Sequence, residues 1–154
     1  MRPILKILVP TDFSSCAEEA LHHAIRLARK FDANVTLLNV YSMPALIETQ
    51  PISTVSAELM KGIEEASQVH LAKLKATVEK DLGSGARVQV ASRLGVPYAT
   101  IAEEAKVGNF DLIVIGTHGR TGLNHFFIGS VAERVVRLAP CPVLTVHEPK
   151  PRPL

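Results

Sequence analysis

The residues best suited to chemistry lie between Gly116 and Ser130, in the sequence GTHGRTGLNHFFIGS. Gly116 directly follows an apolar run, and Gly119 comes after two intervening residues. Gly129 and Ser130 follow after nine more. A phosphate oxygen needs N–H donors at about 2.9 Å and no Cβ in the way, which glycine provides. A helix that begins at Ser130 would add a hydroxyl, unpaired amides and the positive end of its dipole. The spacing therefore predicts a loop that cradles phosphate groups.

An ordinary connection from strand to helix, in which glycines only satisfy turns, is the alternative for this segment. Two glycines would fit that alternative, but four, at positions 116, 119, 122 and 129, favour a binding loop. The commonest nucleotide motifs are absent, because no glycine precedes Lys-Ser or Lys-Thr and because Gly83-Ser84-Gly85 comes before a predicted strand. Arg120 would either form charge-assisted bonds to phosphate oxygens or be a solvated surface residue, and the sequence favours neither.

Apolar runs and helical periodicities alternate along the chain. The runs predict strands at 4–9, 35–40, 87–91, 111–115 and 142–146, and the periodicities predict helices at 17–31, 60–78, 98–107 and 130–138. Ser14 or Ser15 is the expected N-cap of the first helix, and Pro97 is expected to open the third. Ser67 replaces one apolar residue in the stripe of the second helix. The order βαβαβαβαβ predicts an α/β fold with a doubly wound parallel sheet covered by helices on both faces.

Ligands of such sheets bind beyond the carboxyl ends of the strands, where the strand order reverses. The two most polar strand exits are Pro10 to Ser14, after the first strand, and Gly116 to Gly119, after the fourth. If those strands are neighbours, both exits line one crevice. The segment 42–56 contains two prolines and no clear periodicity, and is expected to be a long loop.

Length and composition restrict the kind of protein. The 154 residues, 47% of them hydrophobic, suit one domain, expected over residues 1–148 with a flexible tail at 149–154. The formal net charge of +2 gives no strong field for nonspecific binding to nucleic acid or a membrane. Cys16 and Cys141 come without a signal peptide or an apolar run of transmembrane length, so a cytoplasmic location with reduced thiols is expected. The histidines lack the spacing of a zinc site, and no protein-held transition metal is expected.

Four further segments are distinctive in combination with the glycine loop. They are Val9–Ser14 (VPTDFS), Leu37–Val40 (LLNV), Asp111–Gly119 (DLIVIGTHG) and Cys141–Val146 (CPVLTV). Together they resemble the universal stress protein family, whose ATP-binding members carry glycine, two residues, glycine, nine residues, and then glycine with serine or threonine. The resemblance implies an adenine nucleotide alpha hydrolase-like, Rossmann-like fold. Its open five-stranded parallel sheet would have the order 3-2-1-4-5, with the reversal between strands one and four.

The resemblance also implies a ligand and the residues that hold it. The ligand would be ATP, or AMP or ADP, with Mg²⁺ or Mn²⁺ bridging the phosphates. Asp12 would be the acceptor for the ribose or the base, although its position also suits a helix N-cap or a turn. His118 would contact phosphate or face solvent. The residues implied at the adenine and ribose are Pro10, Thr11, Asp12 and Val40, and those implied at the ribose and phosphates are Gly116, Thr117, His118, Gly119, Arg120, Thr121, Gly122, Gly129, Ser130, Val131 and Ala132.

A phosphate loop without an evident general base predicts a regulatory protein that binds nucleotide and has at most slow ATPase activity, and the family resemblance implies a role in the stress response. The alternative is a slow nucleotide hydrolase or phosphotransferase, with Glu48 of the 42–56 loop as the base. A third hypothesis is a structural member that binds no nucleotide and only dimerises. Val143–Val146 is expected at the sheet edge, where pairing across a two-fold axis would give a homodimer, and the family resemblance implies the same arrangement. Prolines at 140, 142 and 149 would shield only the ends of that edge.

Overall fold

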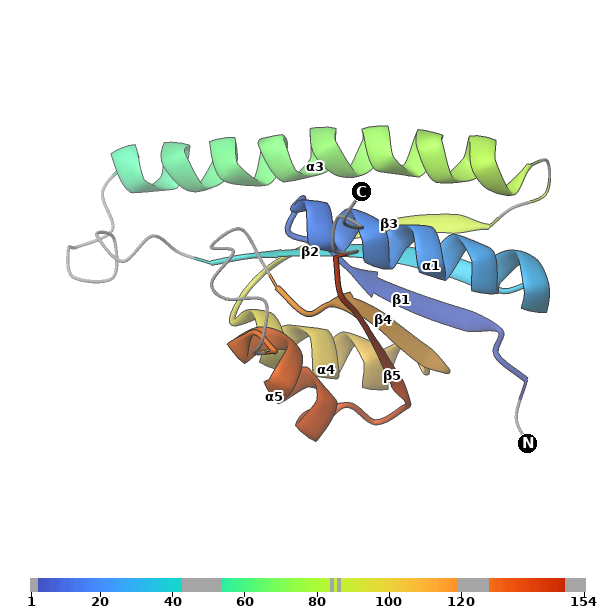
Figure 1. Ribbon diagram of the computed structural model, residues 1–154. Helices are drawn as coiled ribbons and strands as arrows, with labels where there is room; N and C mark the ends of the chain where they lie inside the picture. Colours follow the sequence, from blue (N-terminus) through green and yellow to red (C-terminus); the bar gives the residue numbers. More distant parts are fainter. Residues whose placement is uncertain (1–2, 43–53, 84, 86, 119–127, 149–154) are drawn as a thin grey trace, which may run out of the picture.

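The computed structural model describes residues 3–42, 54–83, 85, 87–118 and 128–148. Strands and helices alternate along these residues, as Figure 1 shows. The strands are β1 (Lys6–Pro10), β2 (Asn34–Tyr41), β3 (Val88–Leu94), β4 (Leu112–Gly116) and β5 (Val143–Val146). The helices are α1 (Ser15–Phe31), α3 (Thr54–Leu82), α4 (Pro97–Val107) and α5 (Ser130–Leu138).

The strands form one parallel sheet in the order β3-β2-β1-β4-β5, which confirms the predicted order. β1 pairs with β2 on one side and with β4 on the other. The chain therefore builds the sheet outward from β1 in one direction, and then returns to build it in the other. The carboxyl ends of β1 and β4 are neighbours at this reversal, which is where open α/β sheets place their ligands.

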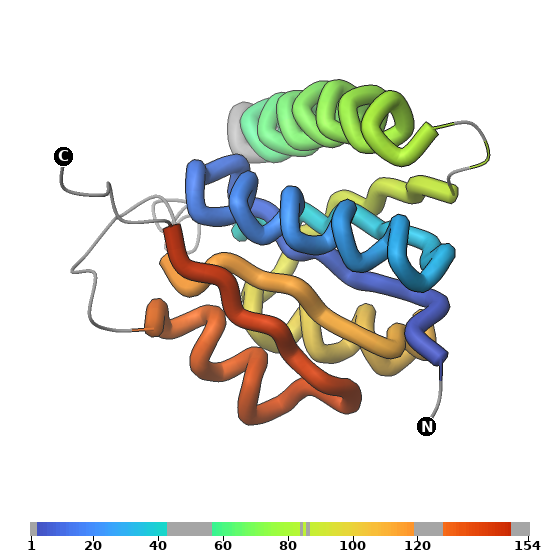
Figure 2. Tube along the Cα trace, turned by 45° about the vertical axis from the view of Figure 1, so that its right-hand side comes forward, coloured from blue at the N-terminus to red at the C-terminus, as the bar shows by residue number. Residues whose placement is uncertain are grey.

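The sheet lies between two layers of helices. In Figures 1 and 2, α1 and α3 cover one face and α4 and α5 cover the other. The residues of β1 alternate between the two cores: Ile7 and Val9 pack beneath α1 and α3, whereas Leu8 packs beneath α4 and α5. All three are fully buried, as expected of a central strand covered on both faces.

Local signals explain where most elements begin and end. The Ser14 hydroxyl accepts a hydrogen bond from the Ala17 amide and caps α1, as predicted. Gly83, at a φ of +88°, follows the last turn of α3 in the left-handed conformation that glycine adopts without strain. The bounds of α5 agree with the predicted helix at 130–138. No described helix is both long enough and apolar enough to cross a membrane.

Several predicted boundaries differ from the structure, and two of these differences have a clear cause or consequence. β3 continues beyond residue 91 to Leu94, because Ser92 and Arg93 pair with Asn39 and Val40 of β2 although their polarity ends the apolar run. The long helix α3 begins at Thr54, inside the segment predicted as a loop at 42–56. The rest of that segment, 43–53, lies outside the described residues, and so does Glu48.

Candidate ligand site at the strand-order reversal

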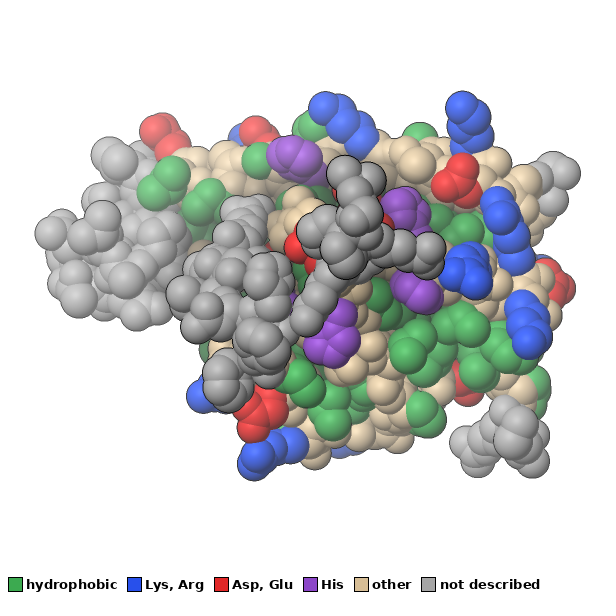
Figure 3. Space-filling model, viewed as in Figure 1, with side chains coloured by type: hydrophobic (Ala, Val, Ile, Leu, Met, Phe, Trp, Pro, Cys, Tyr) green, Lys and Arg blue, Asp and Glu red, His purple; other side chains and the backbone are tan. Residues whose placement is uncertain are grey.

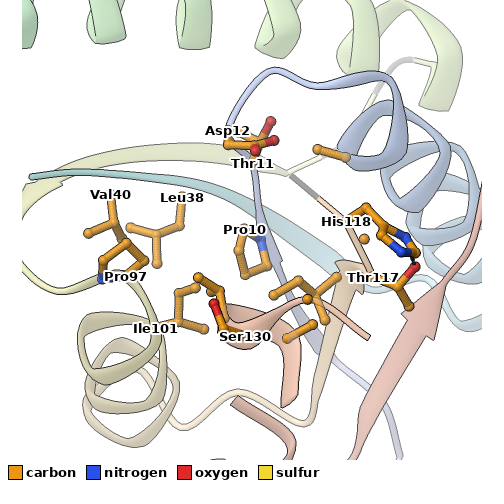
Figure 4. Close-up of a pocket in the computed structure, with 16 residues that line it drawn as sticks. Pro10, Thr11, Asp12, Leu38, Val40, Pro97, Ile101, Thr117, His118 and Ser130 are labelled. Atoms are coloured by element: carbon orange, nitrogen blue, oxygen red, sulfur yellow. Dashed lines mark hydrogen bonds between the residues drawn. The ribbon is translucent and has the colours of Figure 1, made fainter. Parts of the chain in front are cut away.

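A cavity of about 270 Å³ opens at the carboxyl ends of β1 and β4. It is bounded by the exits of these two strands, by β2, and by the first turns of α4 and α5. Figure 4 shows Leu38, Val40, Pro97 and Ile101 on one side of it and Thr117 and His118 on the other. The two strand exits singled out in the sequence therefore meet in one crevice, as the strand order requires.

Most of the residues predicted for the site line this cavity. They are Pro10, Thr11, Asp12, Val40, Gly116, Thr117, His118, Gly129, Ser130, Val131 and Ala132. The other four, Gly119, Arg120, Thr121 and Gly122, lie outside the described residues. The cavity is also lined by five residues that the sequence interpretation missed: Ala17, Leu38, Pro97, Ile101 and Ile115.

The missed residues Leu38 and Ile101, together with Val40, give the cavity an apolar wall. Leu38 and Val40 alternate along β2 and therefore face the same side of the sheet, toward α4. Ile101 of α4 completes this wall and is itself buried. An apolar wall of this kind suits the flat face of an aromatic base. The alternation of Leu38 and Val40 was visible in the sequence, but it is equally typical of an ordinary core strand.

The start of α5 also lines the cavity, and Figure 4 shows Ser130 beside Ile101. Gly129 is the N-cap of this helix, and no described side chain makes a capping hydrogen bond there. Among the described residues, the amides at the start of α5 therefore have no side-chain acceptor of the kind that usually satisfies them. Ser130 lies at this helix start and lines the cavity. The arrangement can accept an anionic group through amides, a hydroxyl and the helix dipole.

Two glycines hold the site together through close backbone contacts. A Cβ on Gly116 would lie 2.8 Å from the carbonyl oxygen of Cys16, so β4 could not approach the start of α1 as it does. A Cβ on Gly129 would lie 2.8 Å from the carbonyl oxygen of Thr117. The Gly129 amide donates a hydrogen bond of 2.6 Å to that same oxygen. Gly129 therefore fixes the start of α5 to the exit of β4.

Asp12 belongs to a tight turn between β1 and α1. Its Oδ1 accepts a hydrogen bond of 3.1 Å from the Ser14 amide, and the Thr11 hydroxyl accepts one of 3.0 Å from the Phe13 amide. Phe13 has a φ of +64°, a left-handed conformation that is uncommon for a bulky residue. The turn role considered for Asp12 is thus present, whereas Ser14 is the N-cap. Asp12 also lines the cavity, and its contact with a ligand stays a prediction.

The buried hydroxyl of Thr117, a residue that lines the cavity, forms a junction between two histidine rings. Thr117 is 0% exposed, and its Oγ1 lies 2.9 Å from Nδ1 of both His118 and His147. A hydroxyl has one proton, so it can donate to only one of the two rings. At least one imidazole must therefore carry a proton on Nδ1. His118 lines the cavity, so this junction orients a residue of the site.

The sequence interpretation missed two members of this junction. His147 follows β5, and Cys16, in the first turn of α1, has its Sγ 3.9 Å from the Thr117 hydroxyl. Cys16 donates a hydrogen bond to the Val146 carbonyl and is buried, so its role is structural. The pairing of Gly116 with Val146 puts Thr117 beside His147, so knowledge of the sheet register would have revealed the contact.

No group of three or more histidine, cysteine, aspartate or glutamate side chains suited to a metal ion occurs among the described residues. The ring centroids of His118 and His147 are 6.3 Å apart, and both rings point Nδ1 at Thr117.

Burial, together with the nearby Asp111 carboxylate, raises the pKa of the Cys141 thiol. A raised pKa keeps this thiol protonated near neutral pH, so Cys141 is not an activated nucleophile.

The fold and the cavity define an open α/β domain of the adenine nucleotide alpha hydrolase-like type, with a ligand-sized cavity at its strand-order reversal. The family model described as "Universal stress protein family" matches residues 3–147. The chain belongs to this family, and the resemblance seen in the sequence is confirmed.

Individual relatives agree with this assignment. Universal stress protein MJ0531 of Methanocaldococcus jannaschii is 39% identical over 150 residues, which cover 94% of this chain and 83% of the relative. The solved structure of MJ0577 from the same organism has a TM-score of 0.83 at 29% identity, over 97% of this chain and all of that one. A universal stress protein from Archaeoglobus fulgidus in complex with dAMP shares the fold, with a TM-score of 0.60 at 24% identity over 94% of this chain and 99% of that one. Other universal stress proteins of this fold have been solved with cAMP and with AMP.

Proposed function

We propose that this chain is a cytoplasmic regulatory protein of the stress response that binds ATP, AMP or ADP in the cavity at the strand-order reversal. One observation carries the proposal. The cavity is lined both by an apolar wall, suited to a base, and by a helix start whose amides have no side-chain cap among the described residues and suit a phosphate. The dAMP, AMP and cAMP complexes of other universal stress proteins make adenine nucleotides the first probes to choose.

Each part of the nucleotide has a proposed place. The adenine lies against Val40 and Leu38, with Asp12 toward the ribose. The phosphates lie at the start of α5, at Ser130, and along the segment from Gly116 to Gly122. Mg²⁺ or Mn²⁺ would bridge the phosphate oxygens and need few protein ligands, which is consistent with a site built mainly from amides and hydroxyls.

Titration calorimetry with ATP, ADP and AMP tests this proposal. We expect saturable one-to-one binding, with GTP, which has the same phosphates but a different base, binding at least about 10-fold more weakly, equivalent to about 1.4 kcal/mol. Absence of saturable binding for all three adenine nucleotides would contradict the proposal. Equal affinity for ATP and GTP would show that the apolar wall does not select the base.

The alternative function is slow nucleotide hydrolysis or phosphoryl transfer. No described residue of the cavity is positioned as a general base, apart from Asp12 and His118, which are already engaged in local hydrogen bonds. We therefore expect any phosphate release to be far slower than the roughly 1 per second of ordinary enzymes. Faster release that is lost in Glu48→Gln would favour the hydrolase instead.

We further propose that β5 pairs with its copy in a homodimer. β5 is an edge strand with the uncharged sequence VLTV, whereas the other edge strand, β3, carries Arg93. Leu144 is 37% exposed, and Figure 3 shows hydrophobic side chains gathered on the face where β5 runs. Such an edge invites pairing with another strand.

Light scattering at micromolar concentration should give twice the chain mass of 16.7 kDa. Leu144→Lys should shift the protein to the monomer, because each copy would then bring a positive charge to the paired edge. Val90→Lys is the matched control, since Val90 is 41% exposed on β3, the strand at the opposite edge of the sheet. A wild-type mass of one chain would refute the dimer.

A further inference from the structure

Two polar residues are buried between α3 and the sheet, on the face of the sheet opposite the apolar wall of the cavity. Asn39 of β2 is 6% exposed, and Ser67 of α3 is 5% exposed. Ser67 interrupts the apolar stripe of its helix, and Asn39 interrupts the apolar run of its strand. Burying an amide or a hydroxyl is unfavourable unless its hydrogen bonds are made. Their presence in the core therefore needs a reason.

The reason is a continuous chain of hydrogen bonds that ends at the site. Asn39 Nδ2 donates to the Thr11 carbonyl oxygen at 2.7 Å, and Asn39 Oδ1 accepts from the Ser67 hydroxyl at 2.8 Å. The Ser67 and Ser92 hydroxyls lie 2.7 Å apart. Because Ser67 uses its only proton on Asn39, Ser92 must be the donor to Ser67. All the bonds thus run in one direction, from β3 through α3 and β2 to the turn after β1.

The orientation of the Asn39 amide is determined by its partners. A backbone carbonyl can only accept, so the group facing the Thr11 oxygen must be the amide nitrogen, and Oδ1 must face Ser67. The Thr11 amide in turn donates to the Leu38 carbonyl at 2.8 Å. Both backbone groups of Thr11 are therefore held by β2.

The chain of bonds reaches the cavity through the sheet. Leu38 and Val40 face the cavity, and Asn39, between them, faces α3. Thr11 lines the cavity and begins the turn that contains Asp12. A movement of α3 that breaks the Ser67 bond would leave Asn39 Oδ1 buried without that donor. It would also loosen the amide that holds Thr11.

We propose that three positioning residues, Asn39, Ser67 and Ser92, fix the turn of Thr11 and Asp12 against the bound nucleotide. Through them, binding of nucleotide is coupled to the packing of α3 against the sheet. This inference rests on the proposed nucleotide binding and adds its route of regulation. Because coupling is reciprocal, a bound nucleotide stabilises α3 against the sheet, and displacement of α3 weakens nucleotide binding.

The most informative variant is Asn39→Asp, which keeps the size and the acceptor of the side chain but replaces the donor to Thr11 with a second oxygen. We expect the affinity for AMP and ATP to fall by about 10-fold or more, because a buried hydrogen bond is replaced by repulsion between oxygens. Ser67→Ala should weaken affinity by about 3-fold, since it removes the bond one step further away. Thr77→Ala is the matched control, because the Thr77 hydroxyl is exposed and bonds within α3, to the Lys73 carbonyl. It should leave the affinity unchanged.

Hydrogen exchange of the α3 amides, with and without AMP, separates positioning from plain structural support. The wild type and Thr77→Ala should gain protection in α3 on binding, and Ser67→Ala should lose most of that gain. A purely structural role would lower the melting temperature of the free protein without changing the affinity or the gain in protection, and would overturn the proposal. If Asn39→Asp does not fold, the Ser67→Ala result decides. If the wild type binds no adenine nucleotide, the proposed function itself fails, which is a different outcome.

Discussion

Replacing Gly129 with valine is expected to weaken adenine nucleotide binding by about 100-fold or more, equivalent to about 2.7 kcal/mol. A Cβ at this position would lie 2.8 Å from the Thr117 carbonyl oxygen, which is backbone and has little room to retreat. Valine must therefore push the start of α5 away from the exit of β4. The 2.6 Å hydrogen bond from the Gly129 amide to that oxygen is then lost. The amides and the Ser130 hydroxyl leave the place where they would meet a phosphate.

Calorimetric titration with ATP and with AMP measures this effect, and circular dichroism verifies that the variant folds. Gly62→Ala is the matched control, because a Cβ at Gly62 has nothing within 4 Å and the residue lies within α3. This control should bind as the wild type does and be slightly more stable, since alanine favours a helix interior over glycine by about 1 kcal/mol. Binding by Gly129→Val at wild-type affinity would show that the start of α5 does not hold the phosphates.

The local structure of this protein was largely predictable from its sequence. α5 has the predicted bounds because Ser130 marks its start and its apolar residues recur at helical spacing up to Leu138. β3 was predicted too short because Ser92 and Arg93 are polar. What keeps these two residues in the strand is pairing with β2, and pairing is a tertiary property that no local pattern contains. The strand order came from the family resemblance.

The site was predictable only in part, for a related reason. Glycines and polar residues at strand exits have few roles, so Gly116, Gly129 and Asp12 could be singled out, and all three line the cavity. Leu38 and Ile101 also line it, but they have the pattern of ordinary core residues. His147 and Asn39 were missed because their partners are 30 and 28 residues away in the chain. Such contacts follow from the sheet register and cannot be deduced from spacing in one sequence.

Thr117→Val should destabilise the fold by about 1 to 3 kcal/mol and weaken nucleotide binding by about 10-fold. Valine has nearly the shape of threonine, so packing at this fully buried position is kept and the hydroxyl alone is removed. His118 and His147 both lose a hydrogen bond of 2.9 Å. His118 lines the cavity, and without this bond its ring is no longer oriented by the exit of β4. Denaturant unfolding and titration with AMP measure the two effects separately.

Thr117→Ser restores the hydroxyl without the methyl group and should recover most of the lost affinity, whereas a packing explanation predicts that serine is no better than valine. Nitrogen-15 spectra of the histidines give an independent test. In the wild type, the single hydroxyl proton requires at least one of His118 and His147 to carry a proton on Nδ1. Thr117→Val removes that requirement, so both rings become free to adopt the Nε2–H tautomer. Spectra showing that tautomer for both rings in the wild type would contradict the shared hydrogen bond, and with it the role of Thr117 in orienting His118 toward the nucleotide.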